Sequence, residues 1–404
     1  MTFPPEAPKL LTGTTVIEVS SFVAAPLCGL TLCQLGAEVI RIDPPGGAAD
    51  QRRWPLAKSG TSLYWTGLNR GKKSMTIDMR SREGQKLVQR LVTDGDGLVV
   101  TNSPDRGWLS YDTLSLSRDD VIHVHMVGRA DGSTGVDYTV NAAVGFPLVT
   151  GPSSAHGPIN HVLPAWDVIC GLHGALAVVA ALRQREREGT GARVSIALED
   201  VALATAGNLG FLTEPQVNHL ERERLGNAIF GQYGQDFCCR DGVRIMVVAL
   251  TARQFHDLVN ATGAAEAVTA LERSLDVNFD DEGHRYRYRD VLSALFGIWF
   301  SERTGTQVEQ ALINTSVLFE RFRTFGQVVK DSRVTENSLF APLDQEGVGE
   351  YLAPGMPTLF DGVHPNTGTA PTLGRDTVEI LKGRLNLSNE AIDELSVAGV
   401  ISTN

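Results

Sequence analysis

The stretch TVIEVSSFVAAPLCGLTLCQLGAEVIRID, residues 15–43, decides the fold class of this chain. Its first six residues form a short apolar run typical of a strand, and the segment SFVAAPLCGLTLCQLG has helical apolar spacing and ends at Gly36. Residues 37–43, AEVIRID, then predict a second strand. This order is a β-α-β unit, in which two parallel strands are joined by a short helix.

The same alternation continues along the chain. Residues 72–79 and 97–102 are strand-like, and between them residues 81–95 predict a helix that Ser81 can cap; residues 120–128 alternate as a further strand. Strands that alternate with helices predict an α/β fold with an open, largely parallel sheet, whose ligands gather at the carboxyl ends of the strands. No GxGxxG follows the first strand, so NAD binding lacks its main support.

The second half of the sequence changes character twice. Residues 168–188 predict the longest helix, apolar for about five turns and then charged. Residues 213–227 are polar and loop-like, and we expect a domain boundary there. From about 228 a smaller α+β unit is predicted, opening with a hairpin that turns at Asp241-Gly242. After about 330 the chain loses charge and ends in a helical tail.

Composition narrows the function classes. The chain has 404 residues, 42% of them hydrophobic, and a formal net charge of -11, which opposes broad contact with nucleic acid or anionic membranes. The sequence shows neither a secretory signal pattern nor an apolar run of the roughly 20 residues that span a bilayer, so we expect a cytoplasmic protein. Five cysteines without a CxxC pair predict reduced thiols, and scattered histidines without HExxH spacing make a metal site unexpected.

Asp167 is the one carboxylate in the otherwise apolar stretch HVLPAWDVICG, residues 161–171. Aspartate is a favoured N-cap, so its carboxylate can simply accept a backbone N–H where the long helix begins. A carboxylate fixed at a helix start and partly desolvated by Trp166, Val162 and Leu163 is also a better nucleophile toward an acyl carbon. Both interpretations stay open, since one residue can serve both roles.

A basic cluster lies beside the predicted strands of the N-terminal half. Arg41, Lys72 and Arg106 each stand near a strand end, where a parallel sheet presents donors to phosphates. This pattern indicates a polyphosphate site, although solvated surface charges would give the same pattern.

Three further features carry two interpretations each. Asp137, in GVDYTVNAAVG, is either a second helix cap or a charge partner. Gly231 and Gly234, in GNAIFGQYGQ, belong either to a mobile loop whose amides approach an anion or to simple turns. His161 is either a ligand of an acyl carboxylate or a core histidine.

Taken in order, these segments resemble the family III CoA-transferases. The resemblance begins with VIEVSSFVAAPLCGLTLCQLGAEVIRIDPPGG, continues through LNRGKKSMTIDMRSREGQKLVQRLV and LVVTNSPDRGWL, and runs through AWDVICGLHGALAVVAALRQREREGTGARVSIALED to APTLGRDTVEIL. It covers nearly the whole chain. The resemblance implies a large Rossmann-like domain from residues 1–212 and 331–404, a 213–227 linker, an inserted small domain at 228–330, and an interlocked homodimer with active sites between subunits.

The resemblance also implies roles for single residues. Asp167 falls at the family's catalytic aspartate, which carries the acyl group and then CoA. Basic residues that bind the CoA nucleotide and phosphates correspond to Arg41, Lys72 and Arg106, and Asn102 is added to that set. The segment with Gly231 and Gly234, near the family's Gly-rich loop, is matched only loosely. No tightly bound cofactor is implied, because CoA is part of the substrate.

Two departures from the family pattern indicate a subclass. Val23 stands where formyl-CoA and related intermolecular transferases have a glutamine. Val136, in the triplet Gly135-Val136-Asp137, replaces the histidine of the α-methylacyl-CoA racemases, and valine cannot carry a proton.

Several stretches, among them RGWLSYD, VDYTVN, VTGP and NHVLPAWD, resemble members of the family that move CoA within one molecule. The first hypothesis is therefore intramolecular CoA transfer between the two carboxyl groups of a branched C4-dicarboxylyl-CoA. The alternatives are intermolecular transfer between carboxylic acids, racemisation, and a non-catalytic acyl-CoA-binding protein in which Asp167 only caps a helix.

Overall fold

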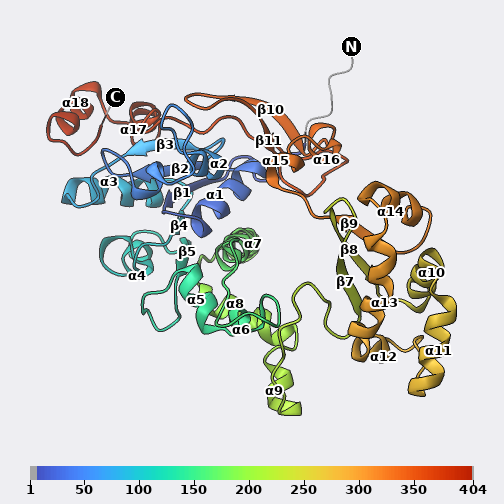
Figure 1. The fold of residues 1–404 in the computed structure, drawn as a ribbon. Helices are drawn as coiled ribbons and strands as arrows, with labels where there is room; N and C mark the ends of the chain where they lie inside the picture. Colours follow the sequence, from blue (N-terminus) through green and yellow to red (C-terminus); the bar gives the residue numbers. More distant parts are fainter. Residues whose placement is uncertain (1–6, 403–404) are drawn as a thin grey trace. The chain divides into compact units, whose positions relative to one another are not determined.

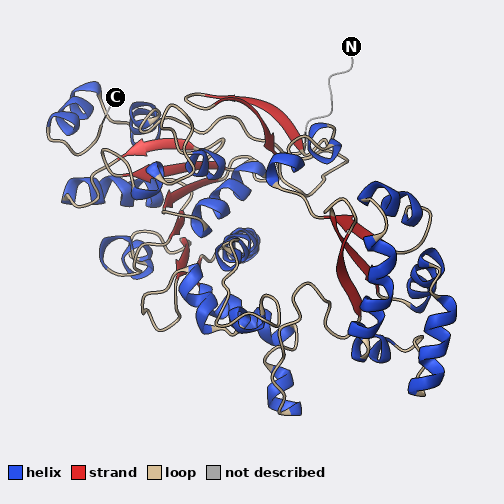
Figure 2. Cartoon of the chain, viewed as in Figure 1, coloured by secondary structure: helices blue, strands red, loops and turns tan. Residues whose placement is uncertain are grey.

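A six-stranded parallel sheet organises the larger part of the molecule. The computed structural model describes residues 7–402 (Figures 1 and 2). The strand order β3-β2-β1-β4-β5-β6 is that of a doubly wound Rossmann-type sheet, so the prediction of a parallel α/β fold is confirmed. The strands are β1 Thr15–Val19, β2 Glu38–Asp43, β3 Lys73–Thr76, β4 Leu98–Thr101, β5 Ile122–Val127 and β6 Ala192–Ala197.

Helices cover both faces of this sheet. The helices in this part of the chain are α1 Ala24–Gln34, α2 Leu63–Leu68, α3 Arg82–Thr93, α4 Tyr111–Ser115, α5 Asp137–Ala143, α7 Ala165–Glu188, α8 Leu198–Asn208, α17 Thr377–Leu385 and α18 Asn389–Val397, with 3-10 turns at Ala49–Arg52 and Gly107–Leu109. A further short helix, α9 Thr213–Asn218, projects away from the sheet (Figure 1). A short helix α16, Ser332–Thr335, and a hairpin of β10, Phe340–Gln345, and β11, Gly349–Pro354, precede α17.

Alternation along β1 separates the two faces. Ile17 and Val19 belong to an apolar core that α3, α17 and α18 complete, so helices from the end of the chain close one face of the sheet (Figure 1). Glu18 points to the opposite face, where a Cβ on Gly29 of α1 would lie only 1.8 Å from its carboxylate oxygen. The sheet therefore carries a buried charge on the face that packs against α1.

Close packing of α7 against α1 and β5 depends on two glycines. A Cβ at Gly171 would lie 2.6 Å from the carbonyl oxygen of Ala24, and one at Gly174 would lie 2.1 Å from Met126. Backbone cannot retreat as a flexible side chain can, so Gly171 is the stricter requirement. Among residues 7–402, α7 is the one helix long and apolar enough to cross a bilayer by length and composition, a test that core helices of soluble proteins also pass.

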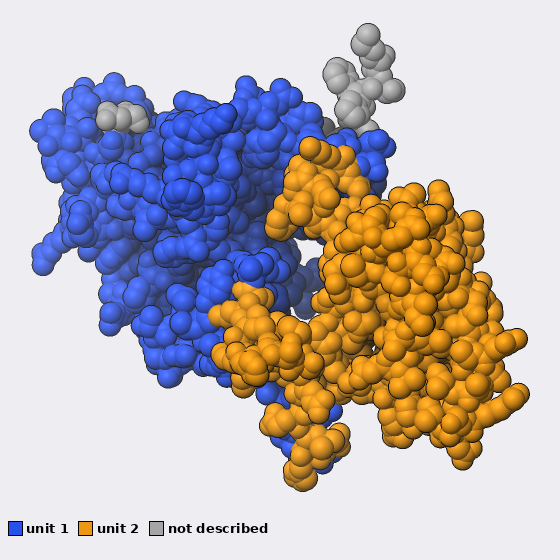
Figure 3. All heavy atoms as spheres, viewed as in Figure 1, with its two compact units in different colours: residues 1–144, 162–217, 332–404 blue, residues 145–161, 218–331 orange. Residues whose placement is uncertain are grey.

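The chain forms two compact units, residues 1–144, 162–217 and 332–404 in the first and residues 145–161 and 218–331 in the second (Figure 3). Residues 145–161 join the second unit, whereas the sequence analysis places them in the large domain. Arg224 explains this grouping, because its guanidinium donates to the carbonyl oxygens of Leu148 and Ala155 at 2.8 and 2.9 Å. A side chain of the second unit thus fixes a loop that directly precedes the Asp167 helix.

The second unit is a small α+β body. Its antiparallel sheet has the order β7-β8-β9 and packs its buried aromatic residues against helices. Its elements are α6 Phe146–Val149, β7 Tyr233–Cys238, β8 Arg244–Ala249, α10 Ala252–Thr262, α11 Ala265–Leu275, α12 Glu282–Arg287, α13 Arg289–Ser301, α14 Gly305–Leu312, β9 Leu318–Arg321 and α15 Phe325–Val328.

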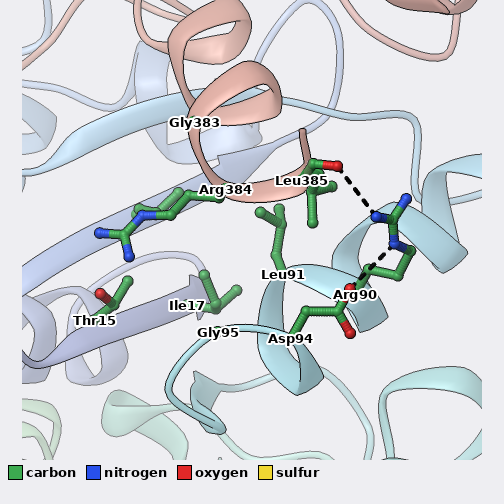
Figure 4. Close-up of a pocket in the computed structure, with 10 residues that line it drawn as sticks. Thr15, Ile17, Arg90, Leu91, Asp94, Gly95, Gly383, Arg384 and Leu385 are labelled. Atoms are coloured by element: carbon green, nitrogen blue, oxygen red, sulfur yellow. Dashed lines mark hydrogen bonds and ion pairs between the residues drawn. The ribbon is translucent and has the colours of Figure 1, made fainter. Parts of the chain in front are cut away.

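A cavity of about 210 Å³ lies at the amino end of the parallel sheet, between β1, α3 and α17 (Figure 4). Arg90 closes one side through an ion pair with Asp94 at 3.3 Å and a hydrogen bond to the carbonyl oxygen of Leu385 at 3.3 Å. Thr15 begins β1, so this cavity lies at the opposite end of the strands from the polar residues described next.

Candidate functional site

The helix that carries Asp167 begins earlier than the sequence indicates. α7 starts at Ala165, with Pro164 as its N-cap, so Asp167 is the third helical residue and does not cap the helix. The apolar pattern alone could not reveal these three extra residues, because Ala165 and Trp166 read equally well as a loop. The start of α7 lies at the carboxyl end of the sheet, since α7 runs back to enter β6.

Asp137 caps α7 from a different helix. Its Oδ2 accepts the backbone N–H groups of Trp166 at 2.8 Å and of Asp167 at 3.2 Å, and its side chain is buried. The Trp166 indole Nε1 donates to Asn141 Oδ1 at 3.1 Å, which ties α5 to α7 a second time. Of the two interpretations of Asp137, the structure shows the helix cap, supplied across space rather than along the chain.

Asp167 combines partial exposure with a strongly perturbed carboxyl group. Burial and, second to it, the charge of Asp137 raise the pKa of Asp167 to about 7, against the opposing charge of Arg53. Within residues 7–402 its carboxylate accepts no hydrogen bond. Val162 and Leu163 are 89% and 59% exposed, so the expectation that they desolvate this carboxylate is wrong.

Arg53 and two aromatic rings form a group that the sequence analysis missed. The guanidinium carbon of Arg53 lies 4.8 Å from the ring centre of Tyr64 and 5.4 Å from that of Phe22. Phe22 has φ +68°, and its N–H donates to Asp50 Oδ2 at 3.0 Å. The stretch RRWP after the second strand was a usable signal, because it follows the carboxyl end of β2.

The Tyr64 hydroxyl is buried and has no hydrogen-bond partner among the described residues. Burial raises the pKa of Tyr64 to about 12, opposed by Arg53 and supported by Asp167, so the phenol stays protonated at neutral pH and can donate. A buried donor without a partner, whose pKa is affected by the Asp167 carboxylate, is a feature that a bound ligand can satisfy.

Arg41 and Lys72 lie inside the protein. Arg41 pairs with Asp43 and Asp50, each at 3.0 Å, and its side chain is fully buried. The Lys72 ammonium lies 2.8 Å from Glu18 and also donates to the Pro26 carbonyl oxygen at 2.8 Å. Buried carboxylates thus bind the N–H donors of Arg41 and Lys72, which we expected to contact phosphates. This geometry favours a structural role for both residues beneath the ends of the strands.

This buried network fixes the loop between β1 and α1. Asp50 holds both Arg41 and the backbone N–H of Phe22, while Asn102 brackets Ser21, accepting its N–H at 3.2 Å and donating to its carbonyl oxygen at 2.9 Å. Val23 follows as the buried N-cap residue of α1. Asn102 and Val23 therefore belong to the same carboxyl edge of the sheet as Phe22.

Arg106 stands apart from that network. It follows β4 at the carboxyl end of the sheet, its residue is exposed, and no carboxylate pairs with it among residues 7–402. It is the member of the predicted phosphate set whose charge faces solvent.

The remaining predicted residues belong to the second unit. His161 is partly buried at the end of the 145–161 segment, Gly231 has φ +74° with open space around it, and Gly234 packs tightly in β7 against Ile229. The site described here is consequently built from the first unit. Within the described part of the chain, no group of three or more His, Cys, Asp or Glu side chains could hold a metal ion.

Comparison with known proteins places these features in a family. The model of the CoA-transferase family III matches residues 11–377. The chain is 44% identical over 97% of its length to a 2-methylfumaryl-CoA isomerase of Chloroflexus aurantiacus, of which 98% is covered. It is 27% identical to a succinyl-CoA–D-citramalate CoA-transferase of the same organism, with 98% of each chain covered.

Solved structures agree with this assignment. A CAIB/BAIF family protein from Brucella suis superposes with a TM-score of 0.77 at 25% identity, covering 94% of this chain and 100% of that one. A hypothetical protein from Mycobacterium tuberculosis gives 0.77 at 25% identity, with 93% and 100% covered. The sheet order, the family match over most of the chain and the near full-length relatives lead to one conclusion: this protein belongs to the CoA-transferase family III.

Proposed function

We propose that this protein moves CoA between the two carboxyl groups of one molecule, converting 2-methylfumaryl-CoA into its isomeric thioester. The observation that carries the proposal is the near full-length, 44% identity to a 2-methylfumaryl-CoA isomerase, in a chain whose Asp167 is a perturbed carboxylate at the carboxyl edge of the sheet. Intermolecular CoA transfer, the activity in the name of the 27% identical relative, is the second candidate.

Four balanced acyl exchanges through Asp167 accomplish the transfer. The carboxylate of Asp167 attacks the thioester carbonyl, and the C–S bond breaks to give a mixed anhydride and the CoA thiolate. The thiolate attacks the aspartyl carbonyl of the anhydride, forming an aspartyl-CoA thioester and releasing the dicarboxylate. Its other carboxylate attacks that thioester, and the expelled thiolate then attacks the substrate carbonyl of the new anhydride. Asp167 is regenerated, and no proton or redox partner is required.

Each exchange passes through an oxyanion that needs hydrogen-bond donors. The backbone N–H groups of Trp166 and Asp167 already donate to Asp137, so they do not supply them. The Tyr64 hydroxyl is a buried donor with no partner among the described residues, and we assign it this task. Its ordinary acidity is suppressed by burial, which keeps the donating proton in place.

Binding of the CoA nucleotide is assigned to Arg106, because its guanidinium is exposed at the end of β4. Arg41, Lys72 and Asn102 support the strand ends and the Ser21 loop from below, and this division follows from the carboxylate and backbone partners that they already have. Arg106→Gln should raise KM for the CoA thioester with little change in kcat.

The experiment that tests the function uses purified protein and 2-methylfumaryl-CoA alone. A new isomeric thioester, separated by liquid chromatography without any added acid, supports intramolecular transfer. Product that forms only when a free carboxylic acid is added would instead establish the intermolecular reaction. Asp167→Ala must abolish turnover in either case, and turnover that survives this substitution refutes the nucleophile.

We also propose that the protein is a homodimer working in the cytoplasm. Leu172 and Leu176, which are 50% and 65% exposed, form with Val179 an apolar stripe at helical spacing along α7. Exposure of such a stripe to water is unfavourable, and burial against a second copy of the chain would remove it from water. Leu176→Glu should lower the mass found by light scattering to that of one chain; an unchanged mass would place the interface elsewhere. Five free cysteines suit a reducing compartment.

A further inference from the structure

The charge balance around Asp167 leaves one cation without a partner. Arg53 makes no ion pair with Asp167 or with any other carboxylate among residues 7–402, while Arg41 and Lys72 are each paired. Its charge nevertheless acts on Asp167, where it opposes the effect of burial on the carboxyl pKa. An unpaired guanidinium that senses the nucleophile is an anion receptor for whatever binds beside that nucleophile.

Two aromatic rings hold this guanidinium in place. Tyr64 and Phe22 contact it at 4.8 and 5.4 Å, and the backbone of the same residue is fixed, since its N–H donates to the Asp50 carbonyl oxygen at 3.1 Å and its carbonyl oxygen accepts from Ser62 at 2.5 Å. Stacking uses the faces of a guanidinium and leaves its N–H edges free. Those edges match the two oxygens of a carboxylate as a fork, so the group is ready to bind a carboxylate with little loss of side-chain entropy.

We propose that Arg53 binds the free carboxylate of a dicarboxylyl-CoA and so makes the enzyme specific for acyl groups that carry a second carboxyl group. This assignment rests on the proposed function and names the residue that selects its substrate class. Arg53 forms no covalent bond; it is a substrate-binding residue, and the bonds that break and form are those at Asp167.

The same contact explains why transfer can stay within one molecule. Release of the dicarboxylate from the thioester leaves a dianion beside an aspartyl-CoA thioester, and this dianion must turn end over end before its other carboxylate attacks. Both ends are carboxylates, so Arg53 can hold either one while the opposite end faces Asp167. An acyl group from a monocarboxylic acid has no second carboxylate for Arg53 to bind.

The test compares covalent adduct formation from two thioesters in single-turnover experiments, following the aspartyl-CoA thioester by mass spectrometry of the intact protein. The first thioester, 2-methylfumaryl-CoA, has a free carboxylate, and the second, crotonyl-CoA, has none. In Arg53→Gln we expect the apparent second-order rate to fall at least about 30-fold for the first and less than about 2-fold for the second, because only the first loses a charge-assisted pair. Arg53→Lys should recover part of the loss, since it restores charge without the fork.

Arg52→Gln is the matched control, because it removes the same charge one residue away, from an arginine that is exposed like Arg53 but does not contact Phe22 or Tyr64. It should leave both rates unchanged. Equal losses for both thioesters in the Arg53 variant, or no loss for either, would overturn the assignment; a circular dichroism melt identical to wild type shows that such losses do not arise from unfolding.

Failure of the proposed function has a different signature. If wild-type protein forms adducts but no isomer of 2-methylfumaryl-CoA, the isomerase proposal fails, and the role of Arg53 is decided by the same comparison between succinyl-CoA and butyryl-CoA. Selective loss with succinyl-CoA would still support it. Absence of adduct from every thioester would overturn both proposals.

Discussion

Asp167→Asn should abolish CoA transfer and at the same time stabilise the protein. Asparagine keeps the size of the side chain and removes the charge. A carboxyl group whose pKa is raised on folding binds its proton more tightly in the folded state, so its ionised form destabilises the fold. For Asp167 the pKa rises from 3.8 to about 7. The free energy of unfolding is therefore lower when the Asp167 carboxylate is charged, and removing the charge raises it.

The size of the expected stabilisation follows from this rise of about three in the pKa of Asp167. At about 1.36 kcal/mol per unit it corresponds to roughly 4 kcal/mol, and because the carboxylate keeps partial contact with solvent we reduce this to about 2 kcal/mol. The gain is fully present above pH 7, where the folded protein carries the charge. It shrinks as the pH falls toward 4, because the folded state then holds the proton and no charge is buried.

Urea unfolding at pH 8 and at pH 5 measures this effect. The midpoint of Asp167→Asn should exceed that of wild type clearly at pH 8 and by less at pH 5. Asp119→Asn removes a charge from an exposed position and should change stability by no more than about 0.5 kcal/mol at either pH. A stabilisation of Asp167→Asn that is equal at both pH values would refute the electrostatic reasoning, and a loss of stability at pH 8 would show that the carboxylate is stabilised in the fold.

Three other substitutions test the site and its support. The acid limb of wild-type kcat/KM should lie near pH 7, and Asp137→Asn should move it to lower pH, because the like charge that raises the pKa of Asp167 is gone; a stationary limb in a pH–rate profile would contradict this. Gly171→Ala should lower the free energy of unfolding by about 1–3 kcal/mol through overpacking, seen as a lower thermal midpoint. Gly383→Ala, at an exposed position on α17 with open space for an added Cβ, should be neutral or stabilising. Lys72→Met should cost about 3 kcal/mol in urea unfolding, because its buried partner Glu18 then keeps only the more distant Arg41, at 3.6 Å, as a counter-charge; a cost below about 1 kcal/mol would show that the Lys72–Glu18 pair is dispensable.

Local patterns predicted the sheet well. The strands expected at 37–43, 97–102 and 120–128 appear as β2, β4 and β5 within two residues at each end, because apolar alternation and flanking breakers act over short stretches. The long helix was placed correctly at its end and three residues late at its start. That error matters chemically, since it changes Asp167 from a cap into a residue of the first turn.

The contacts around the site could not be predicted in the same way. The cap that Asp137 supplies to α7 joins residues about 30 positions apart, and no local pattern encodes such a contact. Arg41 and Lys72 have the composition of a phosphate site, yet strand alternation turns them toward Glu18 and the buried face. Arg53 escaped notice because the two rings that contact it come from separate parts of the chain, Phe22 from the loop after β1 and Tyr64 from α2.

Two carboxylates at the start of α7 divide a task that one could not perform. Asp137 is buried, and its Oδ2 accepts the helix amides, so it fixes the position of the first turn. Asp167 is deprived of those amides, which would otherwise bind its oxygens and lower its reactivity toward a carbonyl carbon. Its pKa of about 7 leaves roughly half of the molecules ionised at neutral pH. A loss of about twofold in the ionised fraction is a small cost for a carboxylate that accepts no hydrogen bond within the described chain. Because Asp137 caps α7 across space, Asp167 can stand in the first turn of the helix without capping it.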